Sequence, residues 1–277
     1  MNGCQLTEQM RGLRMIRLIA SDMDGSLLND EKKIPPEFFE VLPRLHEKGI
    51  RFFVASGRSY CTLKDNFAAV ADQIGYICDN GANVYYQDVC RVKLLPGELL
   101  KPLLLACEEL PGIQILLCGV NGTYVKSYSK EFDFEIGNYY HNRRFVERLT
   151  DVNDDIFKVA ICDMKNPMNR TYPFLKERFG DKLNLQVSGM YWMDVMNREV
   201  NKGTALETIQ NELGISPEET MAFGDFYNDI QLLQHAKYSF VMANSNEDMR
   251  QYGNYMAESN NDNGVMKAIR KYALQEE

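Results

Sequence analysis

The sequence contains no apolar run that approaches the roughly 18 residues needed for a membrane-spanning helix. Its first 15 residues also lack an apolar core segment, so we expect no secretory signal peptide. The seven cysteines are odd in number, scattered, and include no C-x-x-C pair. This pattern argues against a disulfide framework or a structural zinc site and suits a reducing compartment, so we expect a cytoplasmic protein.

The sequence also contains fewer basic than acidic residues. The 31 Lys and Arg residues stand against 39 Asp and Glu residues, which leaves a formal net charge of −8. An acidic chain repels polyphosphate, so nucleic acid is a poor default partner. No internal repeat or low-complexity segment is evident, and the 45% hydrophobic and 25% charged residues are typical of a globular protein. At 277 residues the chain exceeds the size at which single cores stop growing, about 250 residues, and this predicts two domains.

Apolar strands alternate with helices at both ends of the chain. Near the N-terminus, strands are predicted over 15–20, 50–55 and 76–78, with a helix beginning at Pro35. After Asn201 the alternation resumes, with helices and strands predicted over 202–213, 220–223, 228–235, 238–242, 255–257 and 264–274. Strands that are apolar on both faces are typical of a parallel sheet. The sequence therefore predicts an α/β fold with a Rossmann-like, doubly wound parallel sheet core.

The middle of the chain has a different pattern, typical of an α+β domain with an antiparallel sheet. Hairpins are predicted at 84–94 and around Asn121-Gly122. The other elements expected there are a helix over 96–110, a strand over 156–162, a helix over 171–179 and strands over 183–187 and 190–193. We therefore expect a flexible tail over 1–14, a catalytic core from 15–83 and 190–277, and an inserted α+β cap domain over 84–189. Translation could begin at Met1 or at Met15.

Four polar segments share one placement, because each follows an apolar strand or begins a helix. Ligands bind at that edge of an open parallel sheet, so the four segments could meet. In the first segment, Asp22 and Asp24 could act as nucleophile and proton donor, although an Asp-x-Asp pair alone is more often part of a turn or cap. In the second, the Ser56 hydroxyl and nearby backbone N–H groups could bind phosphate, although a serine there is more often only a helix cap.

The third segment begins a helix with Lys202, where the helix dipole disfavours a cation. A functional lysine could outweigh that cost, but a solvated lysine is the commoner explanation. The fourth segment groups Asp225, Asn228 and Asp229, whose oxygen atoms suit Mg²⁺, although such a cluster can also simply cap a helix. Each segment alone has an ordinary explanation. Together they supply the nucleophile, acid/base, donors and metal clamp that phosphoryl transfer requires.

In order, these segments resemble the four motifs of the haloacid dehalogenase superfamily of phosphatases, and within it the Cof-type sugar-phosphatase-like branch. The matching segments are Asp22-Met23-Asp24-Gly25-Ser26-Leu27-Leu28, Ser56-Gly57-Arg58, Lys202-Gly203 and 224–229. Ser26 stands where the family usually has threonine, and the hydroxyl is retained. Asn80-Gly81-Ala82 and Asn263-Gly264-Val265 also match recurring segments of the family. The resemblance extends from Met15 to the end of the chain, and the position of the insert resembles the family's type-two cap.

The resemblance implies a Mg²⁺-dependent phosphatase that hydrolyses small phosphate monoesters, such as sugar phosphates or phosphorylated cofactors, through an aspartyl-phosphate. Asp22 would be the nucleophile and Asp24 the general acid and base. The implied metal ligands are Asp22, Asp24 through its backbone carbonyl, Asp225 and Asp229. The implied phosphate-binding residues are Met23, Ser56, Gly57, Lys202 and Asn228. The expected partner is a small phosphorylated metabolite, with neither nucleic acid nor membrane, and the expected state is a monomer or weak homodimer.

Three alternative functions stay open at this point. A phosphomutase of the same superfamily would use the same nucleophile and a mobile cap. A phospho-acceptor signalling domain also groups Asp, Ser or Thr, and Lys, but its acceptor does not follow the first strand and no large insert interrupts its sheet. A non-catalytic phosphometabolite-binding protein could retain the fold, although every catalytic residue type is present here.

Overall fold

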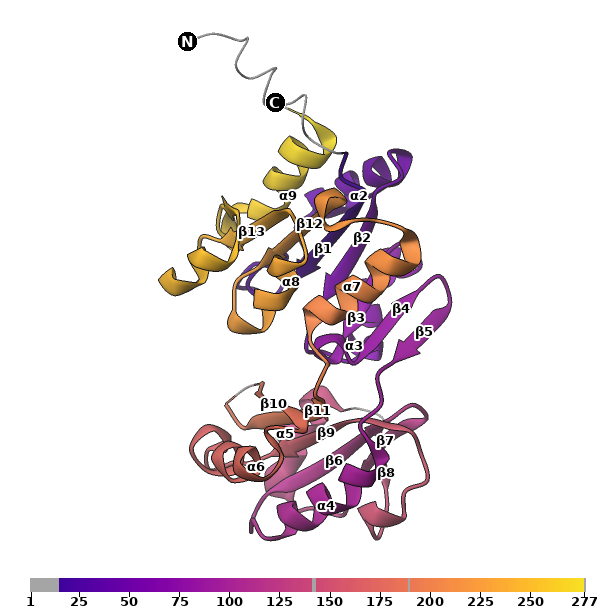
Figure 1. The fold of residues 1–277 in the computed structure, drawn as a ribbon, viewed down its shortest axis with the longest axis vertical. Helices are drawn as coiled ribbons and strands as arrows, with labels where there is room; N and C mark the ends of the chain where they lie inside the picture. The colour runs from indigo at the N-terminus through magenta and orange to yellow at the C-terminus, as the bar shows by residue number, and fades with distance from the viewer. Residues whose placement is uncertain (1–14, 141–142, 189, 277) are drawn as a thin grey trace. The chain divides into compact units, whose positions relative to one another are not determined.

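The computed structural model describes residues 15–140, 143–188 and 190–276, so the expected tail over residues 1–14 lies outside the described residues. The chain divides into two compact units, and each is built from separate segments of the sequence. Among the described residues, the first unit combines 15–56, Phe67–Ile77 and 201–276. The second unit combines Gly57–Asn66 with Cys78–Val200. Figure 1 labels the helices and strands described below.

The first unit contains a parallel sheet with the strand order β14-β13-β12-β1-β2-β3. These strands are β1 (Leu18–Asp22), β2 (Arg51–Ala55), β3 (Gly75–Cys78), β12 (Thr220–Gly224), β13 (Tyr238–Met242) and β14 (Tyr255–Ala257). Every residue of β1, β12 and β13 is buried, as expected for strands covered on both faces. The chain adds strands on one side of β1 and later on the other, so the direction of winding reverses between β1 and β12. This confirms the predicted doubly wound α/β fold.

Two pairs of helices pack against this sheet. One pair is α2 (Glu37–Glu47) and α9 (Gly264–Ile269), and the other is α7 (Lys202–Leu213) and α8 (Ile230–Gln234). In α2 the residues Phe38, Val41, Leu42 and Leu45 are buried, at the three- and four-residue spacing that places side chains on one helix face. Gly214 ends α7 in the left-handed conformation that glycine adopts without strain.

The second unit is an α+β structure with an antiparallel hairpin and a six-stranded sheet. The hairpin joins β4 (Asn83–Tyr86) to β5 (Val89–Val92). The larger sheet has the order β10-β11-β9-β6-β7-β8 and is antiparallel except for the β7–β8 pair. Its strands are β6 (Gln114–Gly119), β7 (Gly122–Val125), β8 (Arg143–Phe145), β9 (Ile156–Cys162), β10 (Leu183–Val187) and β11 (Trp192–Asn197). The helices are α3 (Tyr60–Asn66), α4 (Gly97–Glu108), α5 (Lys130–Tyr139) and α6 (Tyr172–Phe179).

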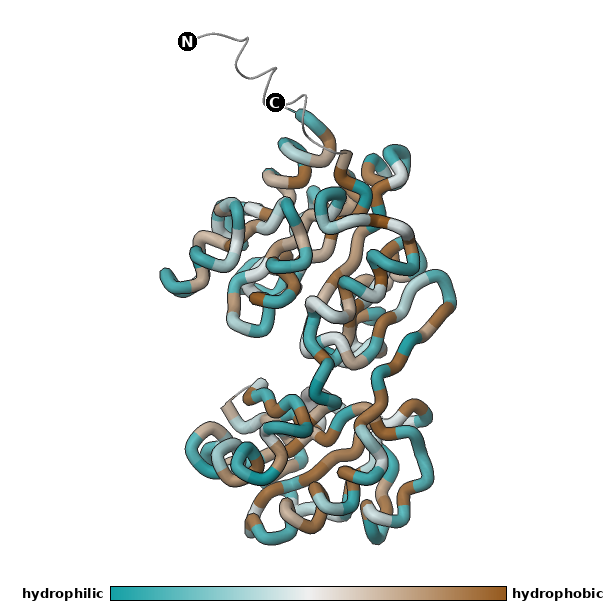
Figure 2. The backbone as a smooth tube through the Cα atoms, in the orientation of Figure 1, coloured by the Kyte–Doolittle hydropathy of each residue, from teal (hydrophilic) through white to brown (hydrophobic). Residues whose placement is uncertain are grey.

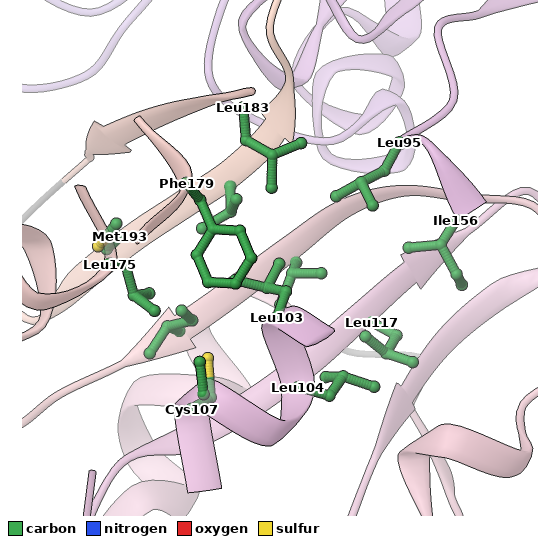
Figure 3. Packing of buried hydrophobic residues seen from close by; sticks show 14 of the residues in the cluster. Leu95, Leu103, Leu104, Cys107, Leu117, Ile156, Leu175, Phe179, Leu183 and Met193 are labelled. Carbon is green, nitrogen blue, oxygen red and sulfur yellow. The ribbon is translucent and has the colours of Figure 1, made fainter. Parts of the chain in front are cut away.

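One cluster of buried hydrophobic residues in the second unit lies between α4, α6 and one face of this sheet; another includes Leu116 of β6, Ala160 of β9 and Ile136 of α5. Figure 3 shows the Phe179 ring of α6 among aliphatic side chains from α4 and from the strands. The buried residues drawn there include Leu103, Leu104, Cys107, Leu117, Ile156, Leu175, Leu183 and Met193. Each fully buried Leu or Phe contributes about 1.5–3 kcal/mol through removal of apolar surface from water. The hydrophobic residues along β6 and β9 in Figure 2 supply the strand side of this core.

The strand β11 extends further than the sequence pattern indicated. A strand was expected over 190–193 at the return to the core, whereas β11 continues to Asn197 and pairs with both β9 and β10. The contacts therefore assign residues up to Val200 to the second unit. Asp194 interrupts the apolar pattern of β11, which is why the pattern ended too early. In the described part of the chain, no helix is long and apolar enough to cross a lipid bilayer.

Candidate active site

Three polar residues lie at the carboxyl ends of the adjacent strands β2, β1 and β12. Asp22 is the last residue of β1, Ser56 directly follows β2, and Asp225 directly follows β12. The register pairs Asp22 with Ala55, the residue before Ser56. Because the winding of the sheet reverses between β1 and β12, this edge is where a doubly wound fold binds its ligand.

Lys202 is the first residue of α7 and lies almost completely buried between two carboxylates. Its Nζ donates to Asp22 Oδ1 and to Asp229 Oδ1, at 2.6 Å each. The helix start is fixed by Asn201, whose side chain accepts a hydrogen bond from the backbone N–H of Thr204 at 2.8 Å. Burial alone would lower the pKa of Lys202, but Asp22 and Asp229 more than offset it, so the pKa is raised. The two ion pairs therefore compensate for a cation at a helix N-terminus.

Three carboxylates meet around one point at this edge of the sheet. One oxygen atom from each of Asp22, Asp225 and Asp229 lies within 4.8 Å of the others. Asp22 Oδ2 is buried without a hydrogen-bond partner among the described residues. Burial, and then repulsion from Asp229, raises the pKa of Asp225 to about 6; burial also raises the pKa of Asp22 well above its usual range. One ammonium group cannot neutralise three carboxylates, and a divalent cation with a preference for oxygen ligands would fit here.

The turn after β1 depends on a glycine that approaches Asp225 closely. Gly25 has φ +88°, in the region that favours glycine, and a Cβ on it would lie 2.3 Å from Asp225 Oδ2. Asn244, which follows the end of β13, donates from Nδ2 to the Gly25 carbonyl at 2.8 Å. The Ser26 hydroxyl donates to Asp225 Oδ1 at 3.4 Å. The turn thus places the backbone beside the carboxylate cluster with no side chain between them.

The fourth segment is held together by hydrogen bonds to Asp229. Its Oδ2 accepts from the backbone N–H groups of Asp225 and Phe226, both at 3.1 Å. Its other oxygen accepts from Lys202. Asp229 is completely buried, and Asn228 beside it is half-buried. Asp229 therefore orients Asp225 and Lys202 at the same time.

The other residues predicted for the site, Met23, Asp24, Ser56 and Gly57, differ in burial and in their contacts. Met23 is buried and its carbonyl accepts from the N–H of Leu28 at 2.8 Å. Asp24 is partly exposed, and its carboxylate pairs with Lys32 Nζ at 3.1 Å. Ser56 is buried in the first unit. Gly57, the next residue in the chain, is exposed and is grouped with the second unit by its contacts.

Sequence reasoning did not find Asn244 or Lys32. Asn244 carries the same signal that identified the other segments, because it follows the apolar strand β13 within two residues. Lys32 has no such signal, since it lies in an exposed turn with φ +61° and reaches Asp24 only through that turn. Three charged residues of the second unit, Asp79, Lys158 and Asp194, were also missed, although each is a buried charge beside apolar residues.

The arrangement can carry out nucleophilic substitution at phosphorus. Asp22 presents a carboxylate that Lys202 holds through one oxygen, while the other oxygen has no hydrogen-bond partner in the part of the chain that the structure describes. Asp24 lies two residues further along, at the partly exposed side of the turn. A nucleophile, an acid/base candidate and a fixed cation at one sheet edge are the groups that this chemistry requires.

Known proteins resemble this chain along nearly its whole length. The profile of the haloacid dehalogenase-like hydrolase family matches residues 19–269. The 5-amino-6-(5-phospho-D-ribitylamino)uracil phosphatase YbjI of Escherichia coli (strain K12) is 32% identical over 262 residues, covering 92% of this chain and 96% of that protein. The phosphatase of the same name, YcsE, from Bacillus subtilis (strain 168) is 26% identical and covers 94% and 96% of the two chains.

A solved structure from Eubacterium rectale superposes with a TM-score of 0.85 at 27% identity, covering 94% of this chain and all of that chain. The family profile spans both units, and the similar proteins include named phosphatases. The motifs that suggested the family therefore reflect common ancestry of the whole chain. The protein is a phosphatase that belongs to the haloacid dehalogenase-like hydrolase family.

Proposed function

We propose that the protein hydrolyses small phosphate monoesters with the help of Mg²⁺, and that Asp22 carries the phosphoryl group between two successive displacements. The observation that supports this most directly is the state of the Asp22 carboxylate. One of its oxygen atoms is held by Lys202, and the other is buried at the carboxylate cluster without a hydrogen-bond partner among the described residues. A carboxylate fixed in this way is oriented for attack, because one of its oxygen atoms is not engaged in a structural hydrogen bond.

In the first displacement, an Asp22 oxygen forms a bond to phosphorus while the bond from phosphorus to the substrate oxygen breaks. Asp24 gives its proton to that leaving oxygen. In the second, Asp24 takes a proton from water as the water oxygen attacks phosphorus, and the bond to Asp22 breaks, releasing inorganic phosphate. The partly exposed position of Asp24 suits a group that must exchange protons with both substrate and water.

Asp22, the Asp24 backbone carbonyl, Asp225 and Asp229 would hold the Mg²⁺. When bound, the ion would neutralise charge on the phosphoryl oxygens. Lys202 would share that role, because its ammonium group is fixed within hydrogen-bonding distance of the nucleophile. The phosphoryl oxygens would otherwise be bound by Met23 N–H, the Ser56 hydroxyl, Gly57 N–H and Asn228.

The substrate proposed first is the phosphate ester of a sugar alcohol that is attached to a nitrogen-containing ring. The chain is 32% and 26% identical to two proteins named as 5-amino-6-(5-phospho-D-ribitylamino)uracil phosphatases, over nearly their full lengths. That compound is a phosphate monoester of a linear sugar alcohol joined to a ring, and it belongs to the proposed class. We also propose that residues 84–189 act as a cap, which excludes water from the site and selects the leaving group.

The variant Asp22→Asn tests the nucleophile. It keeps the size of the side chain and a possible contact with Lys202 but removes the attacking oxygen anion, so turnover should fall to background while the fold is retained. The measurement is release of inorganic phosphate from p-nitrophenyl phosphate and from a panel of phosphorylated metabolites that includes 5-amino-6-(5-phospho-D-ribitylamino)uracil, with and without Mg²⁺. The exposed Asp262→Asn is the matched control and should retain full activity.

Retained activity in folded Asp22→Asn would refute the role of Asp22. A wild-type protein that is folded and loaded with Mg²⁺ but hydrolyses none of the panel would overturn the proposed reaction. Formation of an isomeric phosphate ester in place of inorganic phosphate would instead identify a phosphomutase.

A further inference from the structure

The second unit contains a buried cluster of charges that the proposed reaction does not use. Lys158 lies on β9, and its Nζ contacts Asp79 Oδ1 at 2.5 Å and Asp194 Oδ1, on β11, at 3.9 Å. All three side chains are at least nine-tenths buried. The second Asp79 oxygen accepts from Asn83 Nδ2 at 2.9 Å. Ion pairs at such depth add little net stability, because desolvation offsets the attraction, so stability alone does not account for this cluster.

Asp79 also belongs to a backbone turn in an uncommon conformation. Asp79, Asn80 and Gly81 have φ values of +49°, +54° and +101°, so two consecutive residues with side chains adopt the left-handed region. Such a conformation persists only where surrounding contacts impose it. The bonds from Lys158 and Asn83 to the Asp79 carboxylate are contacts of that kind, and they fix the first residue of the turn.

The same turn contacts the second predicted phosphate-binding segment, within the same unit. The backbone N–H of Asp79 donates to the Arg58 carbonyl at 2.9 Å. The Asn80 amide lies against Gly57, where an added Cβ would come within 3.1 Å of Asn80 Nδ2. Asn80 itself is buried, whereas Gly57 is exposed. The buried turn at Asp79 and Asn80 therefore packs against the backbone of Gly57 and Arg58, and these contacts limit movement of that loop toward the turn.

We infer that Lys158 is a positioning residue for the phosphate-binding loop: it holds Asp79, and through Asp79 and Asn80 it fixes the backbone of Gly57 and Arg58. The inference rests on the proposed function, in which Gly57 N–H binds a phosphoryl oxygen. Lys158 lies 101 positions after Gly57 in the sequence, on a strand of the inserted segment. A residue of that segment would thus set the geometry of the phosphate site without touching the substrate.

The experiment compares Asp79→Asn and Lys158→Arg with wild-type protein, using Asp194→Asn as the matched control. Asp79→Asn removes the negative charge that pairs with Lys158, so that a neutral amide lies opposite the ammonium group. Lys158→Arg retains the positive charge but replaces the compact ammonium group by a larger, planar guanidinium group. Asp194→Asn removes a carboxylate from the same cluster; among the described residues, the Asp194 carboxylate interacts with Asp79 only electrostatically and makes no hydrogen bond to the turn.

The readouts are the inhibition constant of inorganic phosphate, kcat, KM, the Mg²⁺ activation constant and the thermal unfolding temperature. Asp79→Asn and Lys158→Arg should weaken phosphate inhibition and lower kcat/KM by about tenfold or more, because small displacements of a positioning group are costly. The Mg²⁺ activation constant should stay unchanged, since Asp22, Asp225 and Asp229 belong to the first unit. Asp194→Asn should leave phosphate inhibition unchanged, even if its unfolding temperature shifts.

Wild-type phosphate inhibition and kcat/KM in folded Lys158→Arg would overturn the inference, and so would equal losses in Asp79→Asn and Asp194→Asn. If Asp79→Asn fails to fold, Lys158→Arg alone decides between these outcomes. These two outcomes, which overturn the inference about Lys158, differ from failure of the proposed function. In that case the wild-type protein would hydrolyse no phosphate ester.

Discussion

Lys202 takes its position from the helix that begins with it and from the two carboxylates that it contacts. Asn201 and Thr204 fix the start of α7, and Asp22 and Asp229 receive the ammonium group. A solvated lysine at the same helix position could move away from the helix dipole. Lys202 is 1% exposed and cannot move away, so its charge acts on the Asp22 carboxylate.

Lys202→Ala should lower kcat/KM by about a hundredfold or more, the range found when one fixed donor to a developing charge is removed. It should also destabilise the protein, because Asp22 and Asp229 lose the cation between them. Steady-state hydrolysis and thermal unfolding measure the two effects. The exposed Lys101→Ala serves as control, and activity of Lys202→Ala within threefold of the control would contradict the assigned role.

The pKa of Asp225 leads to a prediction about metal binding. Burial and the nearby Asp229 raise this pKa to about 6 in the absence of a cation. A divalent ion binds the ionised form, so protons compete with it, and binding below pH 6 must release a proton. Mg²⁺ affinity should therefore fall as the pH is lowered from 7.5 to 5.5. Calorimetric titration in two buffers of different ionisation enthalpy measures both the affinity and the released proton. An affinity that is constant over this range would contradict the prediction.

The same strand-end placement explains which site residues could be found from sequence. Asp22, Ser56 and Asp225 each follow an apolar strand, so their meeting followed from parallel pairing alone. Lys158 and Asp194 lie inside strands, and nothing in the sequence indicates that they share a partner in Asp79. Such a pairing depends on the register of β9 with β11 and on the turn after β3, which apolar patterns do not specify.

At the scale of elements, the turn between β1 and α2 shows how backbone shape limits the site. Gly25 combines a positive φ with a close approach to Asp225, and these two constraints can be separated by substitution. Gly49, at the end of α2, has φ +68° but open space around its would-be Cβ. Alanine at Gly49 would therefore experience the backbone constraint alone.

Gly25→Ala should abolish most activity and weaken Mg²⁺ binding by tenfold or more, since its Cβ would displace the Asp225 carboxylate. Gly49→Ala should cost about 1 kcal/mol of stability from the strained φ and leave kcat and KM unchanged. Unfolding curves and Mg²⁺-dependent kinetics of the two variants test this contrast. Equal activity in both would show that Gly25 is required only for its φ.

Element boundaries were predictable where apolar residues recur at the spacing of a strand or of a helix. The predicted limits of β9, β10, β13 and β14 agree with the structure, as do those of α7. The helix α5 and strand β8 were not predicted, because aromatic and charged residues are mixed there with no clear period. The segment expected as a helix over 228–235 begins with a tight turn, since the Asp229 side chain accepts the N–H groups of Asp225 and Phe226.

At the scale of the whole molecule, a net charge of −8 opposes the approach of an anionic substrate. Salt screens this repulsion over a Debye length of about 10 Å at 0.1 M, while the contacts inside the buried site are screened much less. At fixed free Mg²⁺, kcat/KM for a phosphate monoester should therefore rise about twofold or more between 20 and 200 mM KCl. The kcat at saturating substrate is the internal control and should stay constant. A fall in kcat/KM with salt would show that local positive potential governs the encounter.

The number of structural units followed from chain length and from the change of pattern in the middle of the sequence. Their exact composition did not, because it depends on contacts between distant segments. Residues 57–66 pack with 78–200, although they lie between two strands of the first unit. That grouping arises from bonds such as Asp79 N–H to Arg58 carbonyl, which no local pattern indicates.

The packing of residues 57–66 with residues 78–200 has a consequence for chimeric proteins in which the insert of one such hydrolase replaces that of another. A chimera joined only at residues 84 and 189 would import Lys158 but keep the host's version of residues 57–66 and of residue 79, the ion-pair partner of Lys158. The donor lysine would then face a foreign partner for its ion pair, and the loop would lose its matched support. Transplants that carry residues 57–66 and 78–83 along with the insert should retain turnover more often than those that leave these residues behind.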